Sequence, residues 1–445
     1  MRRAFAGLFV GAAVLALASS AFAQGAGPKR PAPAPQRPGG LFTTNLSDPG
    51  ERQNLDLTMS STEGYDTSAT PEGSVGGPSV GYSSMLVGTA DYRLQGQHVQ
   101  LRATGTSARY FRPLDNAAFG SGTHTGAIGL SARSRRNTFV VNETAMYSSW
   151  PLENLFARPT GVTPGDAPAA QPDYINNSRS TSYGTAMIFT RTVTPRTTLS
   201  ATGTLQQNET ISGAAGRFGL GMYGGGGQLA HRVTRSTTAT IGYVYRTGQI
   251  DYHILDMRPQ TLEEQGLEVG VNYHRSLSRT RNLIFGVVVG GSSMLTPGPI
   301  TAVDVEQRRT KQVNGQGNAA YEFGQSWQIR ANYRRGVDYV TGLVEPVTAS
   351  TLTTGLTGLL TSRIDLLVSG AHSDGASTLN RSRSVFDVYA TDVRLRYALT
   401  RKFAAYAEYL YYFYDSQGAP LVPGFPLSLE RKGIRVGLML RVAPF

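Results

Sequence analysis

Residues 387–400 read DVYATDVRLRYALT, and after a two-residue turn the chain returns at 403–415 as FAAYAEYLYYFYD. Apolar and polar side chains alternate through the first run, and a third run at 432–442 repeats the pattern. Period-two alternation predicts β-strands with one apolar face and one polar face. The alternating sets are Val393, Leu395, Tyr397 and Leu399 against Asp392, Arg394, Arg396 and Ala398, and Ile434, Val436, Leu438, Leu440 and Val442 against Arg435, Gly437, Met439 and Arg441.

These runs are longer than the strands of most soluble sheets. Ten or more alternating residues exceed the common five or six, and at a tilt of about 45° they cross a hydrocarbon layer roughly 25 to 30 Å thick. After the amino terminus no apolar run of about 18 residues occurs, which excludes helical membrane spans. The sequence therefore predicts an all-β fold, a transmembrane antiparallel up-and-down β-barrel.

The amino terminus predicts export. A positively charged start at 1–3, an apolar core at 4–18 and the small-x-small site Ala21-Phe22-Ala23 are typical of a cleavable signal peptide. A membrane-anchoring helix is the alternative, and the short apolar core argues against it. We therefore expect residues 1–23 to be removed during secretion across the inner membrane.

A proline-rich segment separates the signal peptide from the strands. Residues 25–40 read GAGPKRPAPAPQRPGG, a composition that lacks the apolar residues needed for a core. This segment is either a spacer or a tether for a periplasmic partner. The predicted organisation is a signal peptide at 1–23, a periplasmic linker at 24–50 and the barrel at 51–445.

Tight polar turns recur about every forty residues, with one gap of about sixty. This is the length of two membrane-crossing strands and a longer loop. With a first strand at 54–67 and a last strand from Lys432, the turns predict eighteen strands, or sixteen if the glycine-rich region at 219–227 does not span. If the tight turns are periplasmic, an even number of strands also places the start of the first strand and the end of the last strand in the periplasm. The nine longer connections then lie outside the cell. The eight turns are Gln95-Gly96, Arg135-Arg136, Pro195-Arg196, Arg235-Ser236, Arg279-Thr280, Gln325-Ser326, Ser362-Arg363 and Arg401-Lys402.

A β-propeller is the alternative fold, because its blades have a similar period. Each blade would hold four short strands, whereas here two runs of twelve to fourteen residues fill each period. No repeated Gly-His or Trp-Asp signature occurs.

The signal peptide, the long alternating strands and the terminal aromatic residue resemble bacterial outer-membrane porins and porin-like β-barrels. The resemblance concerns architecture and covers 51–445. It implies an outer-membrane location, contact with the lipid of that membrane, and recognition of the last strand and Phe445 by the barrel-assembly machinery. Phe445 departs from the family pattern, because it has the opposite parity to Ile434 and follows Pro444.

Arginine dominates the charge of the chain. The formal net charge is +12, and only Lys29, Lys311, Lys402 and Lys432 are lysines. The arginines recur at strand period and form no patch or stacking motif typical of nucleic-acid binding. An arginine-rich lumen would favour anions, while pairing with lumen carboxylates is the equally weighted alternative for each residue. The pore-lining candidates are Arg93, Arg102, Arg246, Arg330, Arg334, Arg394, Arg396, Arg435, Arg441, Asp392 and Glu408.

Two further features fit a barrel. The aromatic run at 411–414 is expected at the outer membrane interface, and Trp327 and Phe403 at the inner one. The longest outer connection, 151–178, is either an exposed loop or, by resemblance to porins, a constriction folded into the lumen.

Signals for catalysis or cofactors are weak. The chain has no cysteine, and its six histidines show no metal-ligand spacing. Residues 219–224 match GxGxxG, but glycines follow in place of a helix, which argues against a dinucleotide site. We predict no enzyme activity, cofactor or metal.

Three functions fit these observations. The first is a passive channel for small anionic solutes through an arginine-rich lumen. The second is an export portal for an anionic polysaccharide, similar to an alginate-type exporter. The third is a barrel sheath around a periplasmic multihaem cytochrome.

Overall fold

We describe a computed structural model of the 445-residue chain. The residues described are 53–68, 81–111, 122–148, 179–212, 216–252, 260–278, 280–296, 308–324, 326–338, 347–377, 384–418 and 428–442. The predicted signal peptide, the linker, the 151–178 loop and Phe445 lie outside them.

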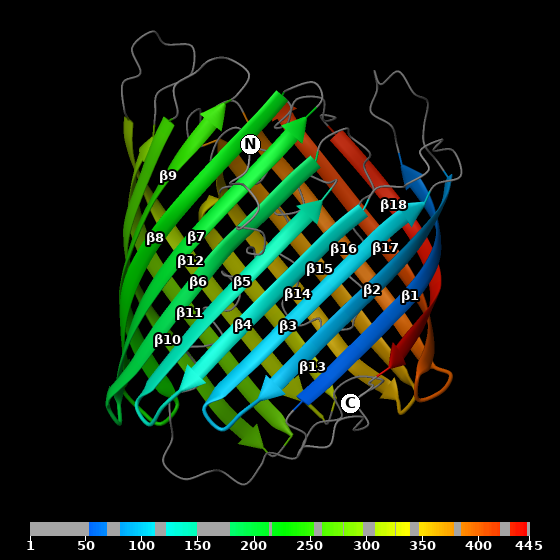
Figure 1. The fold of residues 1–445 in the computed structure, drawn as a ribbon, viewed down its shortest axis with the longest axis horizontal. Helices are drawn as coiled ribbons and strands as arrows, with labels where there is room; N and C mark the ends of the chain where they lie inside the picture. Colours follow the sequence, from blue (N-terminus) through cyan, green and yellow to red (C-terminus); the bar gives the residue numbers. More distant parts are fainter. Residues whose placement is uncertain are drawn as a thin grey trace, which may run out of the picture.

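Eighteen antiparallel strands form one closed barrel (Figure 1). Each strand pairs with its sequence neighbours, and β1 pairs with both β2 and β18, so the sheet closes on itself. The strands are β1 (Gln53–Ser68), β2 (Gly81–Gln95), β3 (Val99–Phe111), β4 (Gly122–Arg133), β5 (Asn137–Ser148), β6 (Arg179–Thr194), β7 (Thr197–Ser212), β8 (Gly216–Arg232), β9 (Thr237–Tyr252), β10 (Gln260–Ser278), β11 (Arg281–Thr296), β12 (Arg308–Phe323), β13 (Trp327–Asp338), β14 (Val347–Thr361), β15 (Ile364–Ser377), β16 (Ser384–Ala398), β17 (Phe403–Gly418) and β18 (Ser428–Val442).

The predicted fold class and the count of eighteen are confirmed, and the alternative of sixteen strands is wrong. The glycine-rich region forms β8, which pairs with β7 and β9 along its length. β18 begins at Ser428, four residues before the predicted start at Lys432. The propeller is excluded, because each strand pairs with two neighbours in a single sheet.

The described residues of the eight predicted turns lie between consecutive strands or, for Gln95, at the end of a strand, at the lower end of the barrel in Figure 1. Arg279 and Gln325 lie outside the described residues. Serine and threonine hydroxyls fix several of them by accepting backbone N–H bonds across the turn. Thr361 Oγ1 accepts from the N–H groups of Arg363 (3.2 Å) and Ile364 (3.1 Å), and Thr400 Oγ1 accepts from Lys402 (3.2 Å) and Phe403 (3.0 Å). Thr361 and Thr400 thus hold the turns that join β14 to β15 and β16 to β17.

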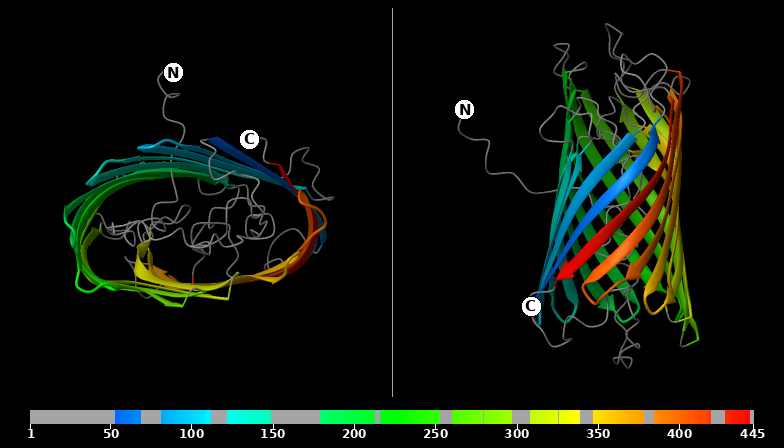
Figure 2. Two further views of the ribbon diagram at one scale, coloured as in Figure 1. Left: turned by 90° about the horizontal axis from the view of Figure 1, so that it is seen from below. Right: turned by 90° about the vertical axis from the view of Figure 1, so that its right-hand side faces the viewer.

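The alternating faces of the strands separate an apolar outer surface from a polar inner one. On β18, Ile434 is 63% exposed and Val436 55%, whereas Arg435 between them is 2% exposed. Tyr406 on β17 hydrogen-bonds Thr62 on β1, which lies two strands away. Side chains of non-adjacent strands meet only on the concave side of a curved sheet, so this buried face is the inner one. The barrel is flattened in cross-section (Figure 2).

Gly437 permits the contact between Tyr406 and Thr62. A Cβ atom at Gly437 would lie 2.6 Å from Tyr406 Cζ and 2.5 Å from the Ser61 carbonyl oxygen. A side chain at this position is therefore incompatible with the packing of the tyrosine over β18.

The aromatic run on β17 differs from the prediction. Tyr411 and Phe413 share the outer face, but Tyr412 and Tyr414 point inward and are buried. A strand turns consecutive side chains to opposite faces, so four adjacent residues cannot all join one outer girdle. Phe403 lies on the outer face near the tight turns, as expected.

No helix among the described residues combines the length and the apolar character that a membrane crossing needs.

Gly358 gives a test of outer-face packing. A Cβ atom there would lie 2.2 Å from Trp327 Cδ2, because the indole lies directly over this glycine. We expect Gly358→Ala to lower the free energy of unfolding by about 1–3 kcal/mol through overpacking. Tryptophan fluorescence during urea unfolding measures the change. The control Gly105→Ala, with nothing within 4 Å of the added atom, should be neutral or slightly stabilising. An equal loss in both variants would contradict this packing.

Candidate functional site

The pore-lining candidates all lie on the inner face of the barrel. Strand register places each of them in phase with the buried set, and the five on β16, β17 and at position 435 of β18 are buried. They are Arg93 on β2, Arg102 on β3, Arg246 on β9, Arg330 and Arg334 on β13, Asp392, Arg394 and Arg396 on β16, Glu408 on β17, and Arg435 and Arg441 on β18.

The inner face of β15 to β18 carries buried ion pairs between neighbouring strands. Arg394 is 1% exposed, and its Nε donates to Glu408 Oε1 at 3.1 Å. Arg396 Nε donates to Asp365 Oδ1 at 2.9 Å, and Nη2 of the same guanidinium donates to Asp365 Oδ2. Bidentate guanidinium–carboxylate geometry is the strongest form of this contact.

Two further charges extend this group. Asp392 Oδ2 lies 3.9 Å from Arg394 Nη2, and Arg435 is the cross-strand neighbour of Glu408. Arg435 is 2% exposed and lies among these groups without facing open solvent. We call Asp365, Asp392, Arg394, Arg396, Glu408 and Arg435 the charge cluster.

Pairs of the same kind continue across the closure of the barrel. Arg441 on β18 donates to Asp56 on β1, with 2.8 Å between Nε and Oδ1. Asp91 on β2 accepts from Arg93 at 3.1 Å and from Arg102 on β3 at 2.7 Å. Sequence reasoning missed Asp56 and Asp365 as partners, because the register that brings them to their arginines spans 385 and 31 residues.

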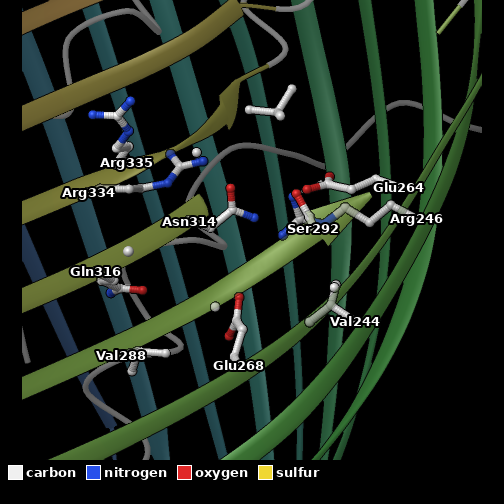
Figure 3. A pocket seen from close by; sticks show the side chains of 15 residues that line it. Val244, Arg246, Glu264, Glu268, Val288, Ser292, Asn314, Gln316, Arg334 and Arg335 are labelled. Carbon is white, nitrogen blue, oxygen red and sulfur yellow. Dashed lines mark ion pairs between the residues drawn. The ribbon is translucent and has the colours of Figure 1, made fainter. Parts of the chain in front are cut away.

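The wall formed by β9 to β13, which β14 separates from β15, contains a pocket of about 640 Å³, a volume that includes the open space at its mouth (Figure 3). Arg246 Nη1 lies 3.5 Å from Glu264 Oε2 at one side of it. Besides valines and glycines, its lining residues are Arg246, Glu264, Glu268, Ser292, Asn314, Gln316, Arg334 and Arg335. Of these lining residues, the sequence predicted Arg246 and Arg334 as pore-lining.

The arrangement supplies fixed charges and polar groups to a lumen. Within the described strands, no three histidine, aspartate or glutamate residues could together hold a metal ion. The GxGxxG match lies in the middle of β8, so its glycines form no phosphate-binding turn before a helix.

No known protein family's model matches the sequence, and no curated protein matches it. Several solved barrels are similar in structure. The FrpB iron transporter of Neisseria meningitidis (F5-1 variant, apoprotein form) has a TM-score of 0.44 at 7% identity, over 88% of this chain and 81% of that one. OccK8 (OprE) of Pseudomonas aeruginosa has a TM-score of 0.42 at 11% identity, over 88% and 98%. The ferric-catecholate import receptor Fiu of E. coli, in its open form, has a TM-score of 0.41 at 10% identity, over 89% and 82%.

These similarities are distant, so the functional argument depends on this chain's own residues. The porin-like barrel architecture predicted from the sequence is confirmed by the closed eighteen-stranded sheet.

The buried pair Arg396–Asp365 can be tested by substitution. Arg396→Met leaves the Asp365 carboxylate buried without its bidentate partner, and we expect a loss of about 3–5 kcal/mol in unfolding free energy. The double variant Arg396→Met/Asp365→Leu should recover most of it, because no unpaired charge remains. Denaturant unfolding in detergent, followed by circular dichroism, measures both.

Arg93→Met is the matched control. The Arg93 side chain is 55% exposed, and Asp91 keeps Arg102 as a partner, so the cost should be about 0–1 kcal/mol. A double variant as unstable as Arg396→Met would contradict the role of the pair.

Proposed function

We propose that this barrel is an outer-membrane channel for passive diffusion of small hydrophilic solutes, with a mild preference for anions. The observation that carries the proposal is the separation of faces in a closed sheet: apolar side chains outside, and charged and polar ones inside. A water-filled passage through lipid requires this distribution. The proposal assigns the chain no enzymatic activity.

The outer face supports contact with lipid. Its middle carries exposed aliphatic residues such as Ile241, Val269 and Val436. Tyrosines occupy its outer end, where Tyr65 packs against Tyr82 at a ring distance of 5.4 Å and Lys432 Nζ lies 5.9 Å from the Tyr411 ring. Aromatic and cationic side chains at a strand end are typical of the membrane interface.

The inner face supports the mild preference for anions. Arginines outnumber carboxylates there, which raises the local concentration of anions, although ion pairing neutralises a large part of the excess. Among residues with described side chains, the inner-facing arginines are Arg93, Arg102, Arg133, Arg232, Arg246, Arg330, Arg334, Arg394, Arg396, Arg431, Arg435 and Arg441, and the inner-facing carboxylates are Asp56, Asp91, Glu264, Glu268, Glu322, Asp365, Asp392 and Glu408.

Assembly and location belong to the same proposal. The signal peptide at 1–23 would direct the chain across the inner membrane, and the last strand with Phe445 would engage the barrel-assembly machinery. The segment 25–40 would serve as a periplasmic spacer or tether.

Single-channel recording in planar bilayers tests the proposed function. Purified protein should give stepwise conductance, and in a salt gradient the reversal potential should be displaced toward the anion. Arg330→Gln, on the inner face of β13, should move the reversal potential toward the cation. Arg309→Gln, an exposed arginine on the outer face of β12, should leave it unchanged.

Clean cation selectivity would contradict the anion preference. Absence of small-ion conductance, together with loss of a secreted polymer on deletion of the gene, would favour the export portal. Copurification with haem would favour the cytochrome sheath.

A charge placed on the outer face tests contact with lipid. Val436 is 55% exposed and lies six residues from Val442, which at a 45° tilt is about 14 Å above the end of the strand. In phospholipid vesicles, Val436→Arg should cost about 2–4 kcal/mol of unfolding free energy.

Val442→Arg, at the strand end, should cost only about 0–1 kcal/mol, because the charge reaches the polar interface. Urea unfolding measures both variants. Equal costs at the two depths would show that this face does not cross hydrocarbon.

A further inference from the structure

One side of the pocket on the β9–β13 wall carries two glutamates with Arg246 beside them, and the other side carries two arginines. Glu264 and Glu268 project from β10, and Arg334 and Arg335 belong to β13. β11 and β12 lie between them and contribute the uncharged polar side chains Ser292, Asn314 and Gln316. In Figure 3 the Arg334 side chain points toward Asn314, and the Glu264 carboxylate lies on the far side of Asn314.

Glu264 is a buried carboxylate without a hydrogen-bond donor on one oxygen. Its side chain is 8% exposed, and Oε2 has no hydrogen-bond partner among the described groups. Arg246 approaches this oxygen only to 3.5 Å, which is an ion-pair contact without a hydrogen bond. Leaving such a carboxylate oxygen unbonded is costly, and a bound cationic donor would remove that cost.

Neutral polar atoms in the middle of the pocket are also unsatisfied. Ser292 Oγ and Asn314 Oδ1 are buried and lack a hydrogen-bond partner among the described groups. Together with Glu264 Oε2 they form a row of groups that can accept hydrogen bonds from a ligand.

Gly290 lets the Glu268 side chain lie close against β11. A Cβ atom at Gly290 would lie 2.4 Å from the Leu267 carbonyl oxygen and 2.9 Å from Glu268 Cγ. A larger residue would disturb the strand and displace Glu268. Glu268 therefore lines the pocket together with Ser292 and Asn314.

We infer that this pocket is a binding subsite for small zwitterions, molecules that carry one ammonium and one carboxylate group. The ammonium group donates to Glu264 Oε2 and interacts with the nearby Glu268. The carboxylate is bound by the Arg334 side, where guanidinium groups offer paired donors. A purely anionic or cationic solute of the same size satisfies only one side. The inference rests on the proposed function, because a subsite in the lumen wall would select among the solutes that diffuse through it.

Calorimetric titration of the full chain in detergent tests the subsite directly. The probes are 4-aminobutyrate and two matched compounds, butyrate and butylamine, each of which lacks one of the charges. We expect 4-aminobutyrate to bind at least roughly tenfold more tightly than either, a difference of about 1.4 kcal/mol. Equal affinity for butyrate would show that the glutamates contribute nothing and would overturn the inference.

Substitutions on both sides of the pocket locate the binding. Glu264→Gln should abolish the preference for 4-aminobutyrate over butyrate while leaving butyrate binding nearly unchanged. Arg334→Gln should abolish its preference over butylamine. The control Glu263→Gln removes the same charge from the adjacent residue, which is exposed on the outer face of the same strand, and should change neither preference.

If Glu263→Gln and Glu264→Gln weaken binding equally, the effect is one of overall charge and the inference is wrong. Circular dichroism and resistance to urea confirm that each variant is folded. The calorimetric experiment requires no conductance, so it separates failure of the subsite from failure of the channel. A channel that conducts but shows no preference for the zwitterion would overturn only the subsite.

Discussion

Closure of the sheet between β1 and β18 is the constraint on which the rest of the structure depends. Twelve registered residue pairs, from Leu57 with Val442 to Ser68 with Arg431, join the first and last strands. Closure leaves no edge strand with unpaired backbone groups, which a sheet surrounded by lipid could not tolerate. It also curves the sheet, so that Tyr406 reaches Thr62 over Gly437 and side chains of non-adjacent strands meet inside.

The same register decides where charge is placed. A shift of one residue would exchange the two faces of a strand and turn Arg394 and Arg396 outward. Their carboxylate partners on β17 and β15 keep both arginines on the inner face, because separating a buried guanidinium from its carboxylate is costly. The charge cluster therefore opposes shifts of register among β15 to β18, the last four strands of the chain. A large share of the lumen arginines serves this structural purpose, which accounts for the weak anion preference that we propose.

The sequence predicted the fold well because its signals are local. Period-two alternation predicted which side chains face outward and which face inward, and the eight polar turns predicted the number of strands. The count was correct even though the glycines of β8 weaken the alternation there. Two of the four adjacent aromatic residues at 411–414, Tyr412 and Tyr414, were assigned to the wrong face because composition was weighed above alternation. The partners of Arg396 and Arg441 and the pocket at Gly290 were not predictable. They depend on which residues of distant strands lie opposite each other, and that follows from register and barrel curvature.

The two walls of the lumen differ in a way that bears on solute recognition. On the β15–β18 wall, Arg394 and Arg396 are already paired with carboxylates, so a passing solute would have to displace a partner that is already well placed. On the β9–β13 wall, Glu264 keeps an oxygen without a hydrogen-bond donor. A solute gains a hydrogen bond at this oxygen without displacing a donor. Any selectivity beyond net charge should therefore originate on the β9–β13 wall, while the β15–β18 wall maintains the shape of the passage.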